Sequence, residues 1–262
     1  MKKFLSEHAR ICFVSLILLA WPGLTKVVLG QGFRSESGNS NPFNTVNTGS
    51  GGTSTSLADL DGDGDLDMIV TKFDGAIQYY INTGVIPPST QPVFILSESV
   101  PIPQPNVGSN KNLKFAFGDL DGDGDLDAVT GNRDGLILPF FNNGTRTNPI
   151  YAQGIIPRGS NRGRAAAGPN NQNIVPGIDY TSEGYTYVSL ADFDADGDLD
   201  MLVITNTAIH YLRNVGSPSA ASFQEVTGCD NPFSAIRITS VVSNPLIGDL
   251  DGVEELYVAF SG

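Results

Sequence analysis

The chain has 262 residues and a formal net charge of −13, with 30 glycines, 16 prolines and 16% charged residues. Such a negative charge argues against a nucleic-acid or anionic-lipid partner, because both carry dense negative charge themselves. The length is sufficient to bury a substantial core, and a composition rich in Gly, Pro, Asn and Thr is typical of an all-β protein with many turns.

The N-terminal segment has the features of a secretory signal peptide. Basic residues precede an apolar run at residues 11–21, and small residues follow up to Gly30. The run is too short to span a bilayer, which disfavours a membrane anchor. We therefore expect residues 1–30 to be removed, leaving a mature domain, residues 31–262, that is secreted or displayed at the cell surface without membrane insertion.

Removal of this segment leaves one cysteine, Cys229, and one histidine, His210. No intrachain disulfide can then form, so metal-binding loops are the expected source of added stability in a secreted chain. A single histidine also disfavours a Ser-His-Asp or Cys-His catalytic site and a catalytic metal site with histidine ligands. We expect His210 to be a partly exposed strand residue, Glu98, Glu183 and Glu225 to have no partner carboxylate, and the chain to have no catalytic residue.

An acidic nonapeptide occurs three times, at residues 59–67, 119–127 and 192–200, with aspartate at every second position. Carboxylates about 5 Å apart repel each other by roughly 3 kcal/mol a pair at an effective dielectric constant near 20, and a divalent cation relieves this repulsion. Ligation by oxygen alone favours Ca²⁺ over Zn²⁺ or copper, and an irregular loop suits Ca²⁺ better than the strict octahedron of Mg²⁺. A solvated acidic turn is the alternative, but it does not explain three copies.

The loop is interpreted by counting its first aspartate as position 1. Positions 1, 3, 5 and 9 supply carboxylates, position 7 supplies its main-chain carbonyl and leaves its side chain free, and glycine at position 6 permits a positive φ. The candidate Ca²⁺ ligands are Asp59, Asp61, Asp63, Asp65 and Asp67 in the first loop, Asp119, Asp121, Asp123, Asp125 and Asp127 in the second, and Asp192, Asp194, Asp196, Asp198 and Asp200 in the third.

The second half of the loop departs from an EF-hand. Position 12 is Val70, Thr130 or Val203, where an EF-hand requires a bidentate glutamate. The residues around these positions are apolar and rich in β-branched side chains. Each loop is therefore predicted to join two β-strands rather than two helices.

The same order of elements surrounds each acidic loop: strand, loop, strand, hairpin turn, strand, Asn-x-Gly and strand. The Asn-x-Gly motif begins at Asn82, Asn142 and Asn214, and the first two hairpin turns contain Asp-Gly. Four strands per unit at this spacing predict an all-β, propeller-like array of about four four-stranded blades. The longer connection at residues 158–184 is predicted to be a flexible surface insertion.

A fourth copy, residues 249–257, keeps only the aspartates at positions 1 and 3, so we expect it to bind Ca²⁺ weakly or not at all. Residues 33–43 share the Phe and Asn-Pro-Phe spacing of residues 223–233, which predicts a fourth strand at the start of the mature chain. We expect this strand to complete the C-terminal blade. The alternative is a fragment of a longer repeat array.

The loops, the Asp-Gly turns and the Asn-x-Gly spacing together resemble FG-GAP/VCBS repeats, the family that includes the β-propeller of integrin α chains. This resemblance implies Ca²⁺ in each of the three loops, with the carbonyl of Asp65 and its counterparts as a ligand. Such repeats usually form seven blades and serve adhesion, matrix or carbohydrate contacts. The present chain has about four units and a degraded last loop, so integrin-like ligand binding does not carry over to it.

These observations predict a secreted calcium-binding repeat module that acts as an extracellular interaction or adhesion scaffold, with an extracellular protein or glycan as its partner. The alternative is an extracellular carbohydrate-active enzyme, or the non-catalytic part of one. A dockerin-like module is disfavoured by the long spacing and the strand-rich flanks. Asn143 lies in an Asn-x-Thr sequence, which is an N-glycosylation acceptor in a eukaryotic secreted protein.

Overall fold

The computed structural model describes residues 41–47, 53–85, 91–99, 101–103, 105, 113–154, 178, 180–234 and 236, together with the backbone of 243–248 and 257–261. The expected signal peptide, the strand expected at residues 33–37 and the fourth acidic loop up to residue 256 lie outside the described residues. The same holds for residues 158–177 of the expected insertion.

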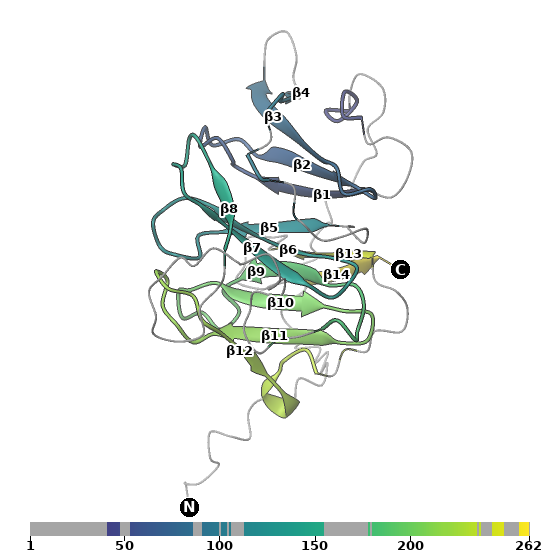
Figure 1. Ribbon diagram of the computed structural model, residues 1–262, viewed down its shortest axis with the longest axis vertical. Helices are drawn as coiled ribbons and strands as arrows, with labels where there is room; N and C mark the ends of the chain where they lie inside the picture. Colours follow the sequence, from purple (N-terminus) through teal and green to yellow (C-terminus); the bar gives the residue numbers. More distant parts are fainter. Residues whose placement is uncertain are drawn as a thin grey trace, which may run out of the picture.

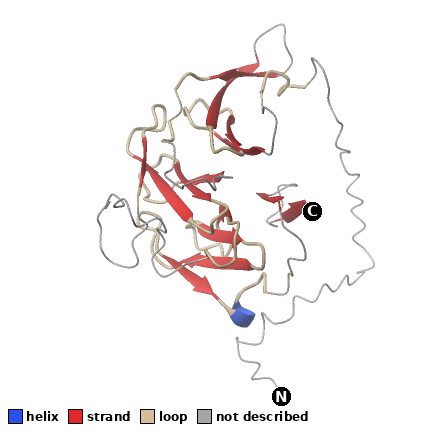
Figure 2. Ribbon diagram, turned by 45° about the vertical axis from the view of Figure 1, so that its right-hand side comes forward, coloured by secondary structure: helices blue, strands red, loops and turns tan. Residues whose placement is uncertain are grey.

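Three four-stranded antiparallel sheets follow one another along the chain, each with its strands in sequence order (Figure 1). The first comprises β1 (Thr53–Ala58), β2 (Asp67–Lys72), β3 (Ile77–Val85) and β4 (Pro92–Leu96); the second β5 (Lys114–Gly118), β6 (Asp127–Gly131), β7 (Ile137–Asn142) and β8 (Tyr151–Gln153); the third β9 (Tyr187–Ala191), β10 (Asp200–Ile204), β11 (Ile209–Asn214) and β12 (Phe223–Val226). A two-stranded sheet, β13 (Ser243–Gly248) and β14 (Tyr257–Ser261), follows a short 3-10 turn, η3 (Gly228–Asp230) (Figure 2).

The order of elements predicted from the sequence is confirmed in all three sheets. Each acidic loop joins the first strand to the second, a tight turn joins the second to the third, and the Asn-x-Gly motif follows at the end of the third. The second strands β2, β6 and β10 are buried over almost their whole length. Their continuous apolar sequences are accounted for by this position, because a strand covered on both faces has no exposed side that favours polar residues.

The sheets pack through their first strands. β1 lies against β5, β5 against β9, and β9 against β13. Side-chain and main-chain hydrogen bonds cross these contacts: the Ser56 hydroxyl donates to the Phe115 carbonyl (2.6 Å), and the Thr186 N–H donates to the Asn132 carbonyl (2.8 Å). The Ser56 hydroxyl and the Thr186 N–H therefore find their acceptors across the contact between neighbouring sheets.

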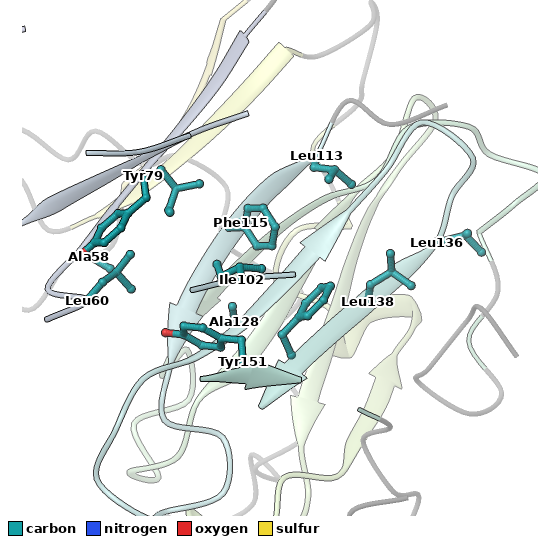
Figure 3. Packing of buried hydrophobic residues seen from close by; sticks show 12 residues of the cluster. Ala58, Leu60, Tyr79, Ile102, Leu113, Phe115, Ala128, Leu136, Leu138 and Tyr151 are labelled. Atoms are coloured by element: carbon teal, nitrogen blue, oxygen red, sulfur yellow. The ribbon is translucent and has the colours of Figure 1, made fainter. Parts of the chain in front are cut away.

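Two hydrophobic cores lie on opposite faces of the second sheet. The core shared with the first sheet includes Leu60 and Phe115 (Figure 3), and the core shared with the third sheet includes Met201. Successive residues of β6 divide between them, because Ala128 belongs to the first core and Val129 to the second. This alternation follows from the two-residue period of a strand, and it makes the second sheet the layer that both cores share.

The aspartate at position 9 of each loop is fully buried and connects the loop to its sheet. In the first sheet, Asp67 Oδ2 accepts hydrogen bonds from the Leu60 N–H (3.1 Å) and the Tyr79 hydroxyl (2.9 Å), and Oδ1 accepts one from the Asn82 N–H (2.8 Å). The pattern recurs where Asp127 accepts from the N–H groups of Leu120 and Asn142, and where Asp200 accepts from those of Phe193 and Asn214 and from the Tyr211 hydroxyl.

The asparagine that begins each Asn-x-Gly motif extends this network to the fourth strand. The side-chain oxygens of Asn82, Asn142 and Asn214 accept the N–H of the glycine two residues later, at 3.0, 2.9 and 3.1 Å. In the second and third sheets the same oxygen also accepts the N–H of Ile150 or Ser222, near the start of the last strand. One aspartate and one asparagine therefore fix the loop, the end of the third strand and the following turn.

We expect the Asp67→Asn variant to lose about 2–3 kcal/mol of unfolding free energy in the presence of a chelator, because the amide nitrogen cannot accept hydrogen bonds from the buried donors. The matched control is Asp63→Asn, the same chemical change at an exposed position of the same loop. Urea unfolding of both variants measures the difference. Equal losses in the two variants would show that the buried network is not what holds the sheet.

Candidate metal centre

Each acidic loop brings three carboxylates together. The three groups are Asp59, Asp61 and Asp63; Asp119, Asp121 and Asp127; and Asp192, Asp194 and Asp200. Within each group, one oxygen per residue lies within 4.8 Å of the others. The remaining predicted ligands, which are Asp65, Asp67, Asp123, Asp125, Asp196 and Asp198, belong to the same loops but lie outside these groups.

Backbone geometry folds each loop around its first aspartate. The glycine at position 6 has φ of +96° at Gly64, +91° at Gly124 and +94° at Gly197, the left-handed conformation predicted from the sequence. This turn directs main-chain N–H groups inward: Asp119 accepts from the N–H groups of Gly122 (2.6 Å) and Gly124 (3.0 Å). The second loop is therefore organised by hydrogen bonds to the carboxylate at position 1, and so is the third, where Asp192 accepts from the N–H groups of Asp196 and Gly197.

Each loop also buries a carboxylate oxygen that has no hydrogen-bond partner. These oxygens are Oδ1 of Asp59, Asp125 and Asp198. A buried polar atom without a partner is destabilising, and a hard divalent cation ligated by oxygens would supply the missing interaction. The residues present therefore fit a cation of the Ca²⁺ type.

The side chain at position 7 differs among the three loops. It is exposed at Asp65, as expected for a residue that ligates through its carbonyl, but only 7% and 9% exposed at Asp125 and Asp198. The expectation of a free side chain, made for Asp65, therefore does not extend to Asp125 and Asp198. Burial, followed by the nearby Asp123 and Asp196 carboxylates, raises the pKa of Asp125 and of Asp198 to about 6.

The buried aspartate at position 9 of the second loop also has a strongly raised pKa. Burial raises the pKa of Asp127 to about 7, although hydrogen bonds from the N–H groups of Asn142 and Leu120 oppose the shift. Burial likewise raises the pKa of Asp67. Protons and cations therefore compete for the same loop carboxylates near neutral pH.

His210 lies at the centre of a second charged cluster. Its Nδ1 is 2.7 Å from Glu225 Oε1, and its Nε2 is 3.0 Å from Glu183 Oε2. A neutral imidazole can donate from one nitrogen only, so both contacts are satisfied together by the imidazolium. Tyr180 packs on the ring, with centroids 4.1 Å apart, and is itself 3% exposed.

This cluster adds to one expectation and corrects another. The sequence offered Glu183 and Glu225 no partner carboxylate for a catalytic pair, and in the structure both contact His210. The end of the expected surface insertion is also packed against the third sheet, through Tyr180 and Glu183. Sequence reasoning missed these contacts because the residues come from separate segments with no shared motif, although His210 is partly exposed as expected.

We expect the unfolding free energy measured in chelator to fall as pH rises from 5 to 8. The carboxyls of Asp125, Asp127 and Asp198 have folded pKa values of about 6 to 7, above the ordinary 3.8. Each of these carboxyls therefore contributes its full stabilisation below the ordinary value. This contribution falls by about 1.4 kcal/mol per pH unit between the ordinary value and the folded pKa, so the loss is complete once pH has passed 6 to 7.

Thermal melts at several pH values, with chelator and with Ca²⁺, measure this dependence. The difference between the two conditions should grow with pH, because deprotonated loops bind the cation better. An unfolding free energy in chelator that rises with pH over this range would contradict the raised pKa values.

Residues 59–130 match the family model of the FG-GAP-like repeat. The matched stretch runs from the first aspartate of the first loop, through the second acidic loop, into β6. No curated protein gives a significant match to the chain. Among the described residues, no helix has the length and apolar character needed to cross a membrane. The chain therefore contains an FG-GAP-like repeat, and the resemblance inferred from its acidic loops is confirmed over residues 59–130.

Proposed function

We propose that this chain is a secreted, calcium-binding FG-GAP repeat module that serves as an extracellular interaction or adhesion scaffold and has no catalytic activity. The observation that carries the proposal is the group of three carboxylates in each of the three acidic loops, with one oxygen per residue within 4.8 Å of the others. Because three loops of the same sequence pattern each gather three carboxylates, a common cation is better supported than three unrelated acidic turns. Ligation by oxygen alone makes Ca²⁺ the preferred cation.

In each loop, the carboxylates at positions 1, 3, 5 and 9 and the main-chain carbonyl at position 7 would hold the cation. The cation would supply positive charge that offsets repulsion among the carboxylates. The position-9 aspartate also accepts hydrogen bonds from the sheet. Cation binding would therefore stabilise the connection between the first and second strands. The role that we propose for the cation is therefore structural.

We further propose that the three sheets are blades of a propeller-like array. The successive contacts of β1 with β5, β5 with β9 and β9 with β13 support this arrangement, because the first strands of propeller blades lie innermost, around a common axis. In this proposal the pair β13 and β14 begins a fourth blade. The strand expected at residues 33–37 would complete that blade.

The Ca²⁺ concentration outside cells fits the proposed cation sites. Extracellular Ca²⁺ modules bind with dissociation constants of about 10⁻⁴ to 10⁻³ M, so near-millimolar Ca²⁺ keeps them largely filled. The net charge of −13 favours an extracellular protein or glycan as partner over nucleic acid. The pairing of Glu183 and Glu225 with His210 also weakens the alternative of a carbohydrate-active enzyme, since it occupies two of the glutamates outside the acidic loops.

We expect Ca²⁺ at 1 mM to stabilise the purified chain by roughly 4 kcal/mol relative to chelator, if three sites bind with dissociation constants of about 10⁻⁴ M. For a domain of this size, the melting temperature should rise by about 10 °C. Mg²⁺ at the same concentration should give a smaller rise, because it demands a stricter octahedral geometry. A melting temperature indifferent to Ca²⁺ would contradict the proposal.

A further inference from the structure

The turn between β7 and β8 reaches from the second sheet to the first acidic loop. Within it, Arg146 Nη2 donates a hydrogen bond to Asp59 Oδ2 at 2.8 Å. The guanidinium side chain is 61% exposed, whereas the Asp59 side chain is only 15% exposed. A positive charge from one sheet is thus placed on the position-1 carboxylate of another sheet.

The same kind of turn covers the second acidic loop. A Cβ atom at Gly62 would lie 3.0 Å from the side chains of Arg146 and Thr147, and one at Gly122 would lie 2.6 Å from Ser219 Cα. The Ala221 N–H also donates to the carbonyl of position 2 in the second loop (3.3 Å). In both cases, the turn that follows Asn-x-Gly in one sheet docks on position 4 of the loop in the preceding sheet.

The two docked turns differ in charge. When Asn142 is aligned with Asn214 through the Asn-x-Gly motif, Arg146 corresponds to Pro218. The first loop therefore receives a guanidinium from its docked turn, and the second loop receives an uncharged residue at the equivalent position. The chain contains a matched pair of acidic loops that differ in this contact.

The two oxygens of Asp59 have different surroundings. Oδ2 accepts the hydrogen bond from Arg146, while Oδ1 is buried without a partner. A charge-assisted hydrogen bond of this length favours the ionised form of the carboxylate. The guanidinium therefore stabilises the ionised first loop without any added cation.

We propose that Arg146 is an internal counter-cation of the first acidic loop, which stabilises the cation-free loop and makes its affinity for divalent cations weaker than that of the second loop. A cation ligated by Asp59 Oδ1 lies close to the guanidinium, and the two positive charges repel each other. Because Arg146 is largely exposed, solvent reduces this effect, and we expect a difference of about two- to fivefold, of the order found for exposed charge pairs. The inference rests on the proposed binding of cations by the loops.

The test is Ca²⁺ titration calorimetry on the full chain with single loops left intact. The first loop is isolated by changing Asp119, Asp121, Asp192 and Asp194 to Asn, and the second by changing Asp59, Asp61, Asp192 and Asp194 to Asn. In the first background, Arg146→Gln should lower the Ca²⁺ dissociation constant about two- to fivefold. Arg146→Lys, which keeps the charge, should leave it within about twofold of the unchanged residue.

The second background is the control, because Arg146→Gln should leave its dissociation constant unchanged. A separate melt in chelator should show a lower melting temperature for Arg146→Gln than for the unchanged chain, with Arg146→Lys in between. An unchanged or higher dissociation constant for Arg146→Gln in the first background would overturn this inference alone. Failure of the unchanged chain to bind Ca²⁺ at all would overturn both this inference and the proposed function.

Discussion

The buried carboxylate at position 9 of each acidic loop is the interaction on which the architecture depends. Asp67 alone accepts hydrogen bonds from the start of its loop, from a tyrosine in the third strand and from the N–H of Asn82. Asn82 then accepts the N–H of Gly84 and so shapes the next turn. A four-stranded unit is thereby held through two polar side chains, and its apolar residues remain available for the cores between sheets.

This arrangement concentrates negative charge at one end of each sheet. Main-chain N–H groups, and in the first loop Arg146, offset part of the repulsion. At least one buried carboxylate oxygen in each loop has no hydrogen-bond partner. The loops thus combine a rigid part, fixed by hydrogen bonds to the sheet, with a part whose stability depends on protons and cations in the surrounding solution.

Much of the fold could be predicted from the sequence because it repeats. The recurrence of the acidic nonapeptide and of Asn-x-Gly predicted the order of strands in each unit, and that order is confirmed. The hydrogen bond between Asp127 and the Asn142 N–H could not be predicted, since each motif was interpreted by itself. The contacts of Arg146 with Asp59 and of His210 with Glu183 also escaped prediction, because they join distant segments and depend on how the sheets pack. The Ca²⁺ ligands and the propeller closure remain predictions.

The two cores on opposite faces of the second sheet have a consequence for how the protein unfolds. Ala128 and Val129 are neighbours in β6 and belong to different cores, so disrupting the second sheet opens both at once. On the side that packs against the second sheet, the first and third sheets each supply only part of the shared core. Such a molecule behaves as a row of nearest-neighbour interfaces rather than a set of independent units. Its cooperativity arises at the boundaries between sheets, and the middle sheet transmits the loss of one boundary to the other.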